Sequence, residues 1–166
     1  MKYLILSIAI FGFLNLSAQN PKGFDEMTSK YVKGTISIVA PNDVITGNVI
    51  FLDARELEEY NVSHIQNAIY VGFDDFKLNK LSEIDKNANV VVYCSIGYRS
   101  EKIGEKLVKE GFTNVKNLYG GIFNWTNNGY PVYQNEVETQ EVHGYSESWS
   151  KWLNKDKVTV ITGKKK

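Results

Sequence analysis

The sequence predicts an α/β fold in which helices cover both faces of a parallel sheet. Two continuous apolar runs, at 49–53 and 89–93, suit strands that are buried on both faces. Segments with helical spacing of apolar residues alternate with the strands, and this alternation indicates βαβ units and a parallel sheet. The 166 residues suit one domain with a sizeable hydrophobic core.

The first half of the chain is expected to contain a helix, two strands and a second, shorter helix. Apolar residues recur at helical spacing over 24–32, acidic residues lie early in this segment, and Gly34 follows it. The β-rich stretch 35–39 predicts a strand that ends at a Pro-Asn-Asp turn. The buried strand 49–53 ends in an acid, and the charged segment 54–60 is expected to form a short helix.

The same alternation continues through the second half of the chain. Helical segments are expected at 74–84, 100–110 and 122–128, and strands at 68–71, 89–93 and 115–118. Gly111 suits the C-cap of the second of these helices, and Gly129 with Pro131 ends the third. The sheet therefore has five expected strands.

The N-terminal segment has the pattern of a secretory signal peptide. A charged start at Met1-Lys2 precedes an apolar stretch, Tyr3–Leu16, that is short for a membrane span. Small residues at Ser17-Ala18 offer a cleavage site after residue 18. We therefore expect residues 1–18 to be removed and the mature chain to be exported to the periplasm with no stable membrane anchor. An uncleaved N-terminal anchor is the alternative.

The C-terminal extension, residues 134–166, is more polar than the rest of the chain. Tyr145, Trp149 and Trp152 are spaced by four and three residues, which would place them on one face of a helix. We expect this helix to pack on the domain, and an aromatic binding stripe is the alternative. The stretch 158–162 is expected to be an edge strand or an ordered tail.

Composition narrows the classes of partner and cofactor. The net charge is zero, so neither nucleic acid nor an anionic membrane is an expected partner. The chain has one cysteine and two histidines, which form no metal-binding cluster, and we expect no metal or other cofactor. His64 is expected to be a hydrogen-bonded structural residue and His143 a surface residue.

The single cysteine, Cys94, lies where the strand 89–93 turns into the helix 100–110. Unpaired backbone N–H groups and the positive end of the helix dipole meet at such a turn, and both stabilise a thiolate. Gly97 allows the turn dihedral angles that other residues resist, and Arg99 adds a fixed positive charge. The turn is therefore expected to be an anion cradle with a nucleophile at its floor. An inert buried thiol is the alternative.

Four stretches in order resemble the rhodanese-like (sulfurtransferase) domain family. They are Leu-Asp-Ala-Arg-Glu at 52–56 with Glu59-Tyr60, the His-Ile segment at 63–69, the Cys94–Arg99 loop, and the Gly120-Gly121 segment through Pro131-Val132. The departures from the family pattern at Ser63, Gln66 and Asn67 lie in a connecting turn. The resemblance runs from about residue 30 to 133. It implies a domain over 24–133 with a five-stranded, mainly parallel sheet.

The resemblance also implies that Cys94 accepts a sulfane sulfur. As a thiolate it would attack thiosulfate or a persulfide donor, and the sulfur would then pass to a thiol or cyanide acceptor. The backbone N–H groups of the loop would surround the sulfur and bind the substrate; they belong to Ser95, Ile96, Gly97, Tyr98 and Arg99. The partners implied are a small sulfur-containing anion or thiol and a protein sulfur acceptor.

The two arginines leave alternatives open. The side chain of Arg99 would either bind the incoming anion or brace the loop. Arg55 follows the end of a strand, where parallel sheets place their ligands, and is a candidate substrate-binding residue. The alternative for Arg55 is a structural salt bridge with Asp53, Glu56 or Glu59.

Two other functions compete with sulfur transfer. A phosphatase or arsenate reductase of the C-x5-R type needs seven residues from cysteine to arginine, whereas Arg99 closes a loop of six, which is too small for phosphate. A non-catalytic rhodanese-like module for binding or for carrying a persulfide to a dedicated partner remains the alternative. The retained Cys94 argues against a module with no chemistry.

Overall fold

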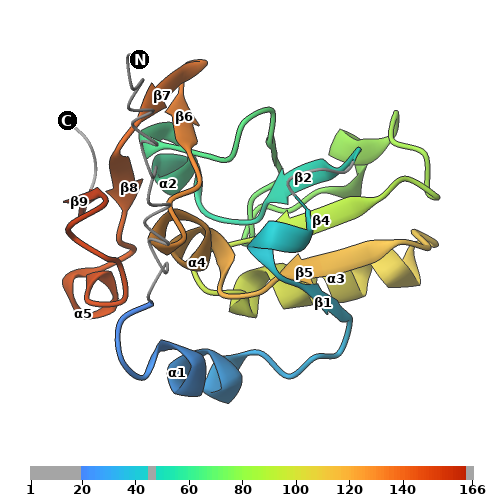
Figure 1. Cartoon of the computed structure of the whole chain (residues 1–166). Helices are drawn as coiled ribbons and strands as arrows, with labels where there is room; N and C mark the ends of the chain where they lie inside the picture. Colours follow the sequence, from blue (N-terminus) through green and yellow to red (C-terminus); the bar gives the residue numbers. More distant parts are fainter. Residues whose placement is uncertain (1–19, 45–47, 164–166) are drawn as a thin grey trace, which may run out of the picture.

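A parallel sheet of five strands forms the centre of the molecule. The computed structural model describes residues 20–44 and 48–163, so the expected signal peptide lies outside the described residues. The strand order is β1-β5-β4-β2-β3, and every pairing in this sheet is parallel (Figure 1). The bounds are β1 Ser37–Val39, β2 Ile50–Asp53, β3 Ile69–Tyr70, β4 Val90–Tyr93 and β5 Val115–Leu118. The predicted fold class and five strands are confirmed.

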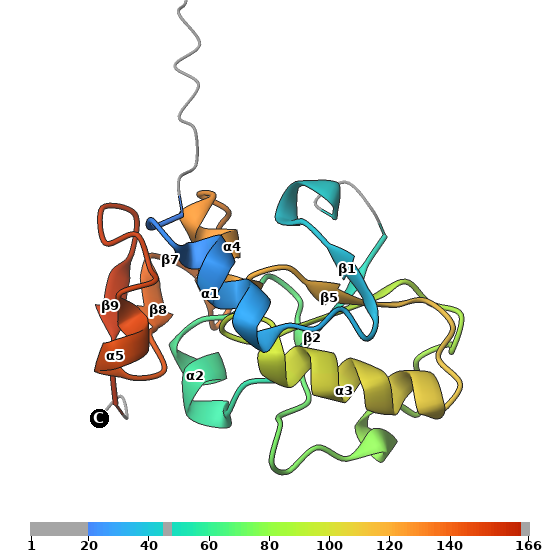
Figure 2. The ribbon, with the colours of Figure 1, turned by 90° about the horizontal axis from the view of Figure 1, so that it is seen from below.

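Helices cover both faces of this sheet, and the core is divided accordingly. On one face α1, Phe24–Tyr31, and α4, Gly121–Asn127, contribute Phe24 and Phe123 to a cluster with Tyr93 of β4. On the other face α3, Tyr98–Lys109, packs its Ile103 against Val92 of the same strand. Figure 2 shows α3 lying along the sheet and α1 close to α4. Alternate residues of β4 therefore enter opposite cores, as its continuous apolar run predicts.

Two of the expected helices differ from what forms. The segment 54–60 forms α2, Leu57–Val62, which begins later because Glu56 and Glu59 make a reciprocal capping box. The expected helix 74–84 is wrong: only a single 3₁₀ turn, Leu78–Leu81, is present. Its apolar residues at 76, 78, 81 and 84 do not share one face of an α-helix, and the turn lets them all reach the core beside α3.

From Val132 onward, the end of the domain and the C-terminal extension contain more strand than helix. β6, Val132–Gln134, and β7, Val137–Thr139, form a hairpin, and β8, Glu141–His143, pairs in parallel with β9, Thr159–Ile161. The last of these strands agrees with the strand expected at 158–162. Helix α5, Glu147–Ser150, crosses between β8 and β9 at one end of the molecule (Figure 1).

The expected aromatic helix of the extension is therefore corrected to a turn of four residues. The physical reason is Tyr145, whose φ of 62° is left-handed and interrupts a helix before Trp149. As a result, the three aromatic side chains do not share a face. Trp152 packs edge-on against Phe24 of α1, with ring centroids 6.3 Å apart, while Tyr145 and Trp149 turn toward the cysteine. Across the residues that the structure describes, no helix is long and apolar enough to span a membrane.

Candidate active site

The cysteine lies at the floor of a tight turn between β4 and α3. Cys94 follows the last residue of β4, and Gly97 (φ 109°) is the N-cap of α3. The Gly97 N–H donates to Cys94 Sγ at 3.2 Å. The thiol is buried, with 1% of its surface exposed. The Gly97 N–H and the N-terminus of the 12-residue helix α3 both direct partial positive charge toward this sulfur.

The N-terminus of helix α4 binds the backbone of the loop that follows β4, at Cys94 and Ser95. The Ile122 N–H donates to the Cys94 carbonyl at 2.8 Å, and the Phe123 N–H donates to the Ser95 carbonyl at 3.1 Å. A Cβ at Gly121 would lie 2.2 Å from that Cys94 carbonyl oxygen, so only glycine permits this approach. The first turn of α4 therefore engages two loop carbonyls.

Asn117 of β5 fixes the other side of the loop. Its Nδ2 donates to the Gly97 carbonyl at 2.9 Å, and its Oδ1 accepts a hydrogen bond from Ser100 Oγ at 2.7 Å. Asn117 is fully buried. This one side chain thus links β5 to both the end of the loop and the first turn of α3.

Replacing Asn117 with alanine is expected to destabilise the protein. The change leaves the Gly97 carbonyl and the Ser100 hydroxyl without their hydrogen-bond partner. An unsatisfied buried polar group lowers the free energy of unfolding by about 1–3 kcal/mol. Denaturant unfolding monitored by tryptophan fluorescence gives this number directly. Asn79→Ala, at an exposed position in the 3₁₀ turn, is the matched control. Equal stability of the two variants would contradict this role for Asn117.

The side chain of Arg99 braces the loop. Its Nη1 and Nη2 donate to the two carboxylate oxygens of Glu59 at 2.6 and 2.8 Å, and Nη2 also donates to Ser95 Oγ at 3.0 Å. Burial alone would raise the pKa of Glu59, but the hydrogen bonds and charge of Arg99 outweigh it and lower that pKa to about 2. The same pairing overcomes burial and raises the pKa of Arg99. These contacts are those expected of a brace; binding of the incoming anion by Arg99, the other role left open by the sequence, stays a prediction.

Arg55 lies apart from the cysteine pocket. It is fully buried, and its guanidinium forms a salt bridge with Asp53 at 2.7 Å and donates to the Ser63 carbonyl at 2.6 Å. Arg55 does not line the pocket at Cys94. The substrate-binding role expected for it is therefore corrected to the structural salt bridge. The physical reason is that β2 ends with Asp53, whose carboxylate turns the Arg55 side chain into the protein.

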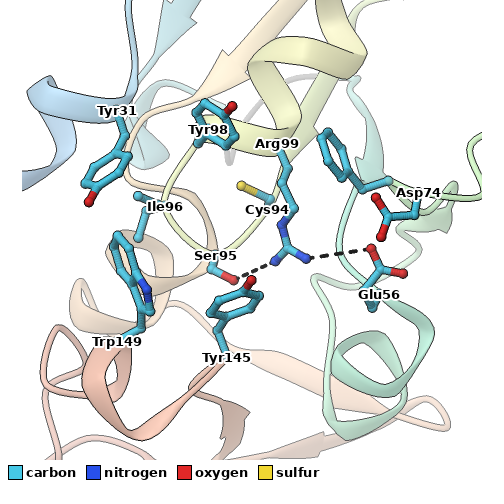
Figure 3. A pocket seen from close by; sticks show the side chains of 11 residues that line it. Tyr31, Glu56, Asp74, Cys94, Ser95, Ile96, Tyr98, Arg99, Tyr145 and Trp149 are labelled. Atoms are coloured by element: carbon cyan, nitrogen blue, oxygen red, sulfur yellow. Dashed lines mark hydrogen bonds and ion pairs between the residues drawn. The ribbon is translucent and has the colours of Figure 1, made fainter.

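A pocket of about 480 Å³ opens above the cysteine (Figure 3). Of the predicted site residues, Cys94, Ser95, Ile96, Tyr98 and Arg99 line it, and Gly97 supports it from the loop. Its other lining residues are Tyr31, Glu56, Phe73, Asp74, Tyr145 and Trp149. Among the residues that the structure describes, no group of three or more histidine, cysteine, aspartate or glutamate side chains is placed to hold a metal ion.

The fold and this loop define a class of protein, and comparison with known families agrees. The model of the rhodanese-like domain matches residues 41–128, and the chain belongs to this family. The resemblance found in the sequence is thereby confirmed. A rhodanese-related protein of Thermoplasma volcanium is 28% identical with a TM-score of 0.53, over 59% of this chain and 98% of that one. A thiosulfate sulfurtransferase of Pseudomonas aeruginosa shares the fold at 23% identity, with a TM-score of 0.56, over 69% of this chain and 23% of that one.

The curated relatives carry a different name. The tRNA uridine(34) hydroxylase of Staphylococcus epidermidis is 32% identical over 148 residues, which are 86% of this chain and 43% of the relative. The enzyme of the same name from Photorhabdus laumondii is 35% identical over 83 residues, 47% of this chain and 24% of the relative. The chain thus spans less than half the length of these relatives.

Sequence reasoning missed three kinds of site residue. The sequence indicates Glu59 only as a possible partner of Arg55. Its partner in the structure is the chain's other arginine, Arg99. Asn117 carries no signal of its own in a short strand. The spacing of Tyr145 and Trp149 indicates a packed helix, with an aromatic binding stripe as the alternative, because a left-handed tyrosine backbone cannot be predicted from spacing.

Proposed function

We propose that this chain is a sulfurtransferase in which Cys94 carries a sulfane sulfur as a persulfide. The thiolate attacks the outer sulfur of a donor, the sulfur–sulfur bond of the donor breaks, and its electron pair leaves with sulfite or a thiolate. An acceptor thiolate or cyanide then attacks the outer sulfur of the persulfide and regenerates the Cys94 thiolate. No oxidant or reductant is needed.

One observation carries this proposal: a buried sulfur that accepts a hydrogen bond from Gly97 at the N-terminus of α3 and also faces a pocket. An inert thiol needs neither a donor nor an open space beside it. A thiolate needs both, because the N–H and the helix dipole stabilise its charge and the pocket admits the donor.

The test is intact-protein mass spectrometry after incubation with thiosulfate or an organic persulfide. We expect the wild-type chain to gain one sulfur atom that cyanide or a thiol removes, and we expect no gain in Cys94→Ser. Since Cys94 is the only cysteine, no other thiol can carry the sulfur. A wild-type chain that alkylates readily but takes up sulfur from neither donor would refute the proposal and favour the binding-module alternative.

Intact-protein mass also tests the export that we propose for the chain, when the protein is taken from its native cell. The pattern of residues 1–18 supports a cleaved signal peptide and a periplasmic location. The protein recovered from its native cell is expected to have the mass of residues 19–166. A periplasmic fraction without the protein, or a mass that includes residue 1, would contradict export.

The relatives' name makes tRNA a second candidate partner. It is at odds with the expectation that nucleic acid is not bound, which rests on a net charge of zero. The observation in favour is the alignment, which extends over 148 residues and so beyond the matched family domain. The affinity for labelled tRNA, measured at several salt concentrations, decides whether tRNA is a partner. Binding through phosphate contacts is expected to weaken steeply as the salt concentration rises.

A further inference from the structure

The aromatic wall of the pocket comes from parts of the chain outside the matched family domain. Tyr31 ends α1, while Tyr145 and Trp149 belong to the C-terminal extension, and the family model covers 41–128. The rings of Tyr31 and Trp149 meet edge-to-face with centroids 5.2 Å apart. We call Tyr31, Tyr145 and Trp149 the aromatic wall.

This wall leaves apolar surface open beside the sulfur. Tyr31 is 42% exposed and Tyr145 is 51% exposed, although both are large rings that a closed core would bury. Figure 3 shows Tyr31 and Trp149 on one side of Cys94 and Ile96 between them and the loop. A flat apolar group bound at Cys94 would therefore contact this side.

Tyr145 is held in place against a conformational cost. Its left-handed backbone is uncommon for a bulky residue, and such strain persists only where the surroundings enforce it. The Tyr145 N–H donates to Nδ1 of His143 at 3.1 Å, and Nε2 of that buried ring lies 3.2 Å from the Gly163 carbonyl. His143 is thus not the expected surface residue, and it accepts a hydrogen bond from the Tyr145 backbone.

The charges on the opposite side of the pocket disfavour an anion. Glu56 and Asp74 line this side (Figure 3), and within the part of the chain that the structure describes Arg99 is the one cationic side chain on the lining. The guanidinium of Arg99 already donates to Glu59 and Ser95, and the Tyr145 ring lies 5.1 Å from its carbon. Its fork is not free to bind a dianion such as thiosulfate.

We infer that the donor at this site is an organic persulfide that reacts in its protonated form, R–S–SH, and whose R group is an aromatic or similarly flat apolar group packed on the aromatic wall. The inference rests on the proposed sulfur transfer and names its substrate class. The Cys94 thiolate bonds to the outer sulfur, the bond between the donor's two sulfur atoms breaks, and R–S⁻ leaves with the electron pair. The proton of the donor stays on the outer sulfur, now attached to Cys94.

Alkylation of Cys94 in the full chain tests the selectivity without requiring sulfur transfer. The probes are iodoacetate, iodoacetamide and N-benzyl iodoacetamide, and intact mass reports their rates at the single cysteine. Each rate is divided by that of N-acetylcysteine with the same probe. We expect iodoacetamide to be favoured over iodoacetate by about tenfold, because two carboxylates repel the anion. We expect N-benzyl iodoacetamide to be favoured over iodoacetamide by about fivefold, because its ring meets the wall.

Variants assign these preferences to residues. Trp149→Ala is expected to abolish the preference for the benzyl probe, measured as the ratio of two rates within one protein. Tyr145→Gly is a second variant, since glycine removes the ring and suits the left-handed backbone. Asp74→Asn is expected to reduce the discrimination against iodoacetate. Tyr133→Ala, at an aromatic residue outside the pocket lining, is the matched control and is expected to change neither ratio.

Sulfur loading separates this inference from the proposed function. Benzyl persulfide is expected to load Cys94 faster than thiosulfate at equal concentration. Loading that is faster with thiosulfate, or a benzyl preference that survives both wall variants, would overturn the inference and leave sulfur transfer intact. Loading from neither donor, with the alkylation preferences present, would instead refute sulfur transfer.

Discussion

Glu59→Gln is expected to lower the free energy of unfolding by about 3–5 kcal/mol, the usual cost of removing one partner of a buried ion pair. The carboxylate of Glu59 accepts two hydrogen bonds from Arg99 and a third from Ser95 Oγ at 3.0 Å. Glutamine keeps the shape of the side chain but leaves Arg99 with only the longer ion pair to Glu56, whose Oε1 lies 4.0 Å from Nη1. Because that pair braces the cysteine loop, the alkylation rate of Cys94 is expected to fall as well.

The same variant is expected to change how stability depends on pH. The pKa of Glu59 is lowered from 4.5 to about 2, so its contribution is present above pH 4.5 and is lost as the pH falls toward 2. A shift of this size corresponds to about 3 kcal/mol. Urea unfolding at several pH values between 2 and 7 is expected to show a steeper loss on the acid side in the wild type than in Glu59→Gln.

Glu58→Gln is the control for both measurements. Glu58 lies on the same helix and is exposed, so its neutralisation is expected to change the free energy of unfolding by less than about 0.5 kcal/mol. If Glu59→Gln behaves like Glu58→Gln, the Arg99 brace does not stabilise the fold. A double variant, Glu59→Gln with Arg99→Gln, measures the coupling between the two side chains.

Gly121→Ala is expected to displace the cysteine loop. Its left-handed φ of 56° costs a non-glycine residue about 1–3 kcal/mol. The new Cβ would also lie 2.2 Å from the Cys94 carbonyl oxygen, so α4 or the loop must move and the hydrogen bonds of Ile122 and Phe123 to the loop weaken. These two bonds add about 1–3 kcal/mol. Misplacement of the sulfur by about 1 Å is expected to slow its reaction with a persulfide by on the order of a hundredfold.

Gly129→Ala separates the backbone cost from the steric clash. Gly129 also has a left-handed φ, 79°, but the nearest atom to a new Cβ is Nζ of the Lys157 side chain at 3.7 Å, an ordinary van der Waals distance. It is expected to lose stability through the backbone alone and to retain the reactivity of Cys94. Equal rates of sulfur loading in Gly121→Ala and Gly129→Ala would show that the approach of α4 does not position the loop.

The sheet and the cysteine loop could be predicted because their signals are local. After Asn89 the run 90–93 is apolar throughout, and β4 accordingly sends Val92 to one core and Tyr93 to the other. The extension could not be predicted in this way, because its spacing of aromatic residues fits a helix whereas its conformation depends on long-range contacts. The Tyr145 backbone is set by His143, and Trp149 is set by Tyr31, which lies in the first helix.

The roles of the two arginines were open for the same reason. Sequence spacing places Arg55 beside Asp53, Glu56 and Glu59. The acid nearest to Arg99 in the sequence is Glu101, whose carboxylate instead accepts hydrogen bonds from the backbone N–H groups of Lys33 and Thr35. The fold brings Glu59 of α2 to Arg99 at the start of α3 and leaves Arg55 to Asp53. Because Arg55, Asp53 and Glu59 are buried, each needs a partner of opposite charge, since an isolated charge in the interior is costly.

The contact between the rings of Tyr31 and Trp149 has a consequence for the order in which the parts of the site form. During synthesis the sheet strands and the Cys94 loop leave the ribosome before the residues that complete the wall. Contacts between distant parts of a chain close large loops and form late in folding. The thiol is therefore built before the aromatic wall, and a nascent or C-terminally truncated chain is expected to react at Cys94 without the preference for flat apolar reagents that we expect of the whole chain.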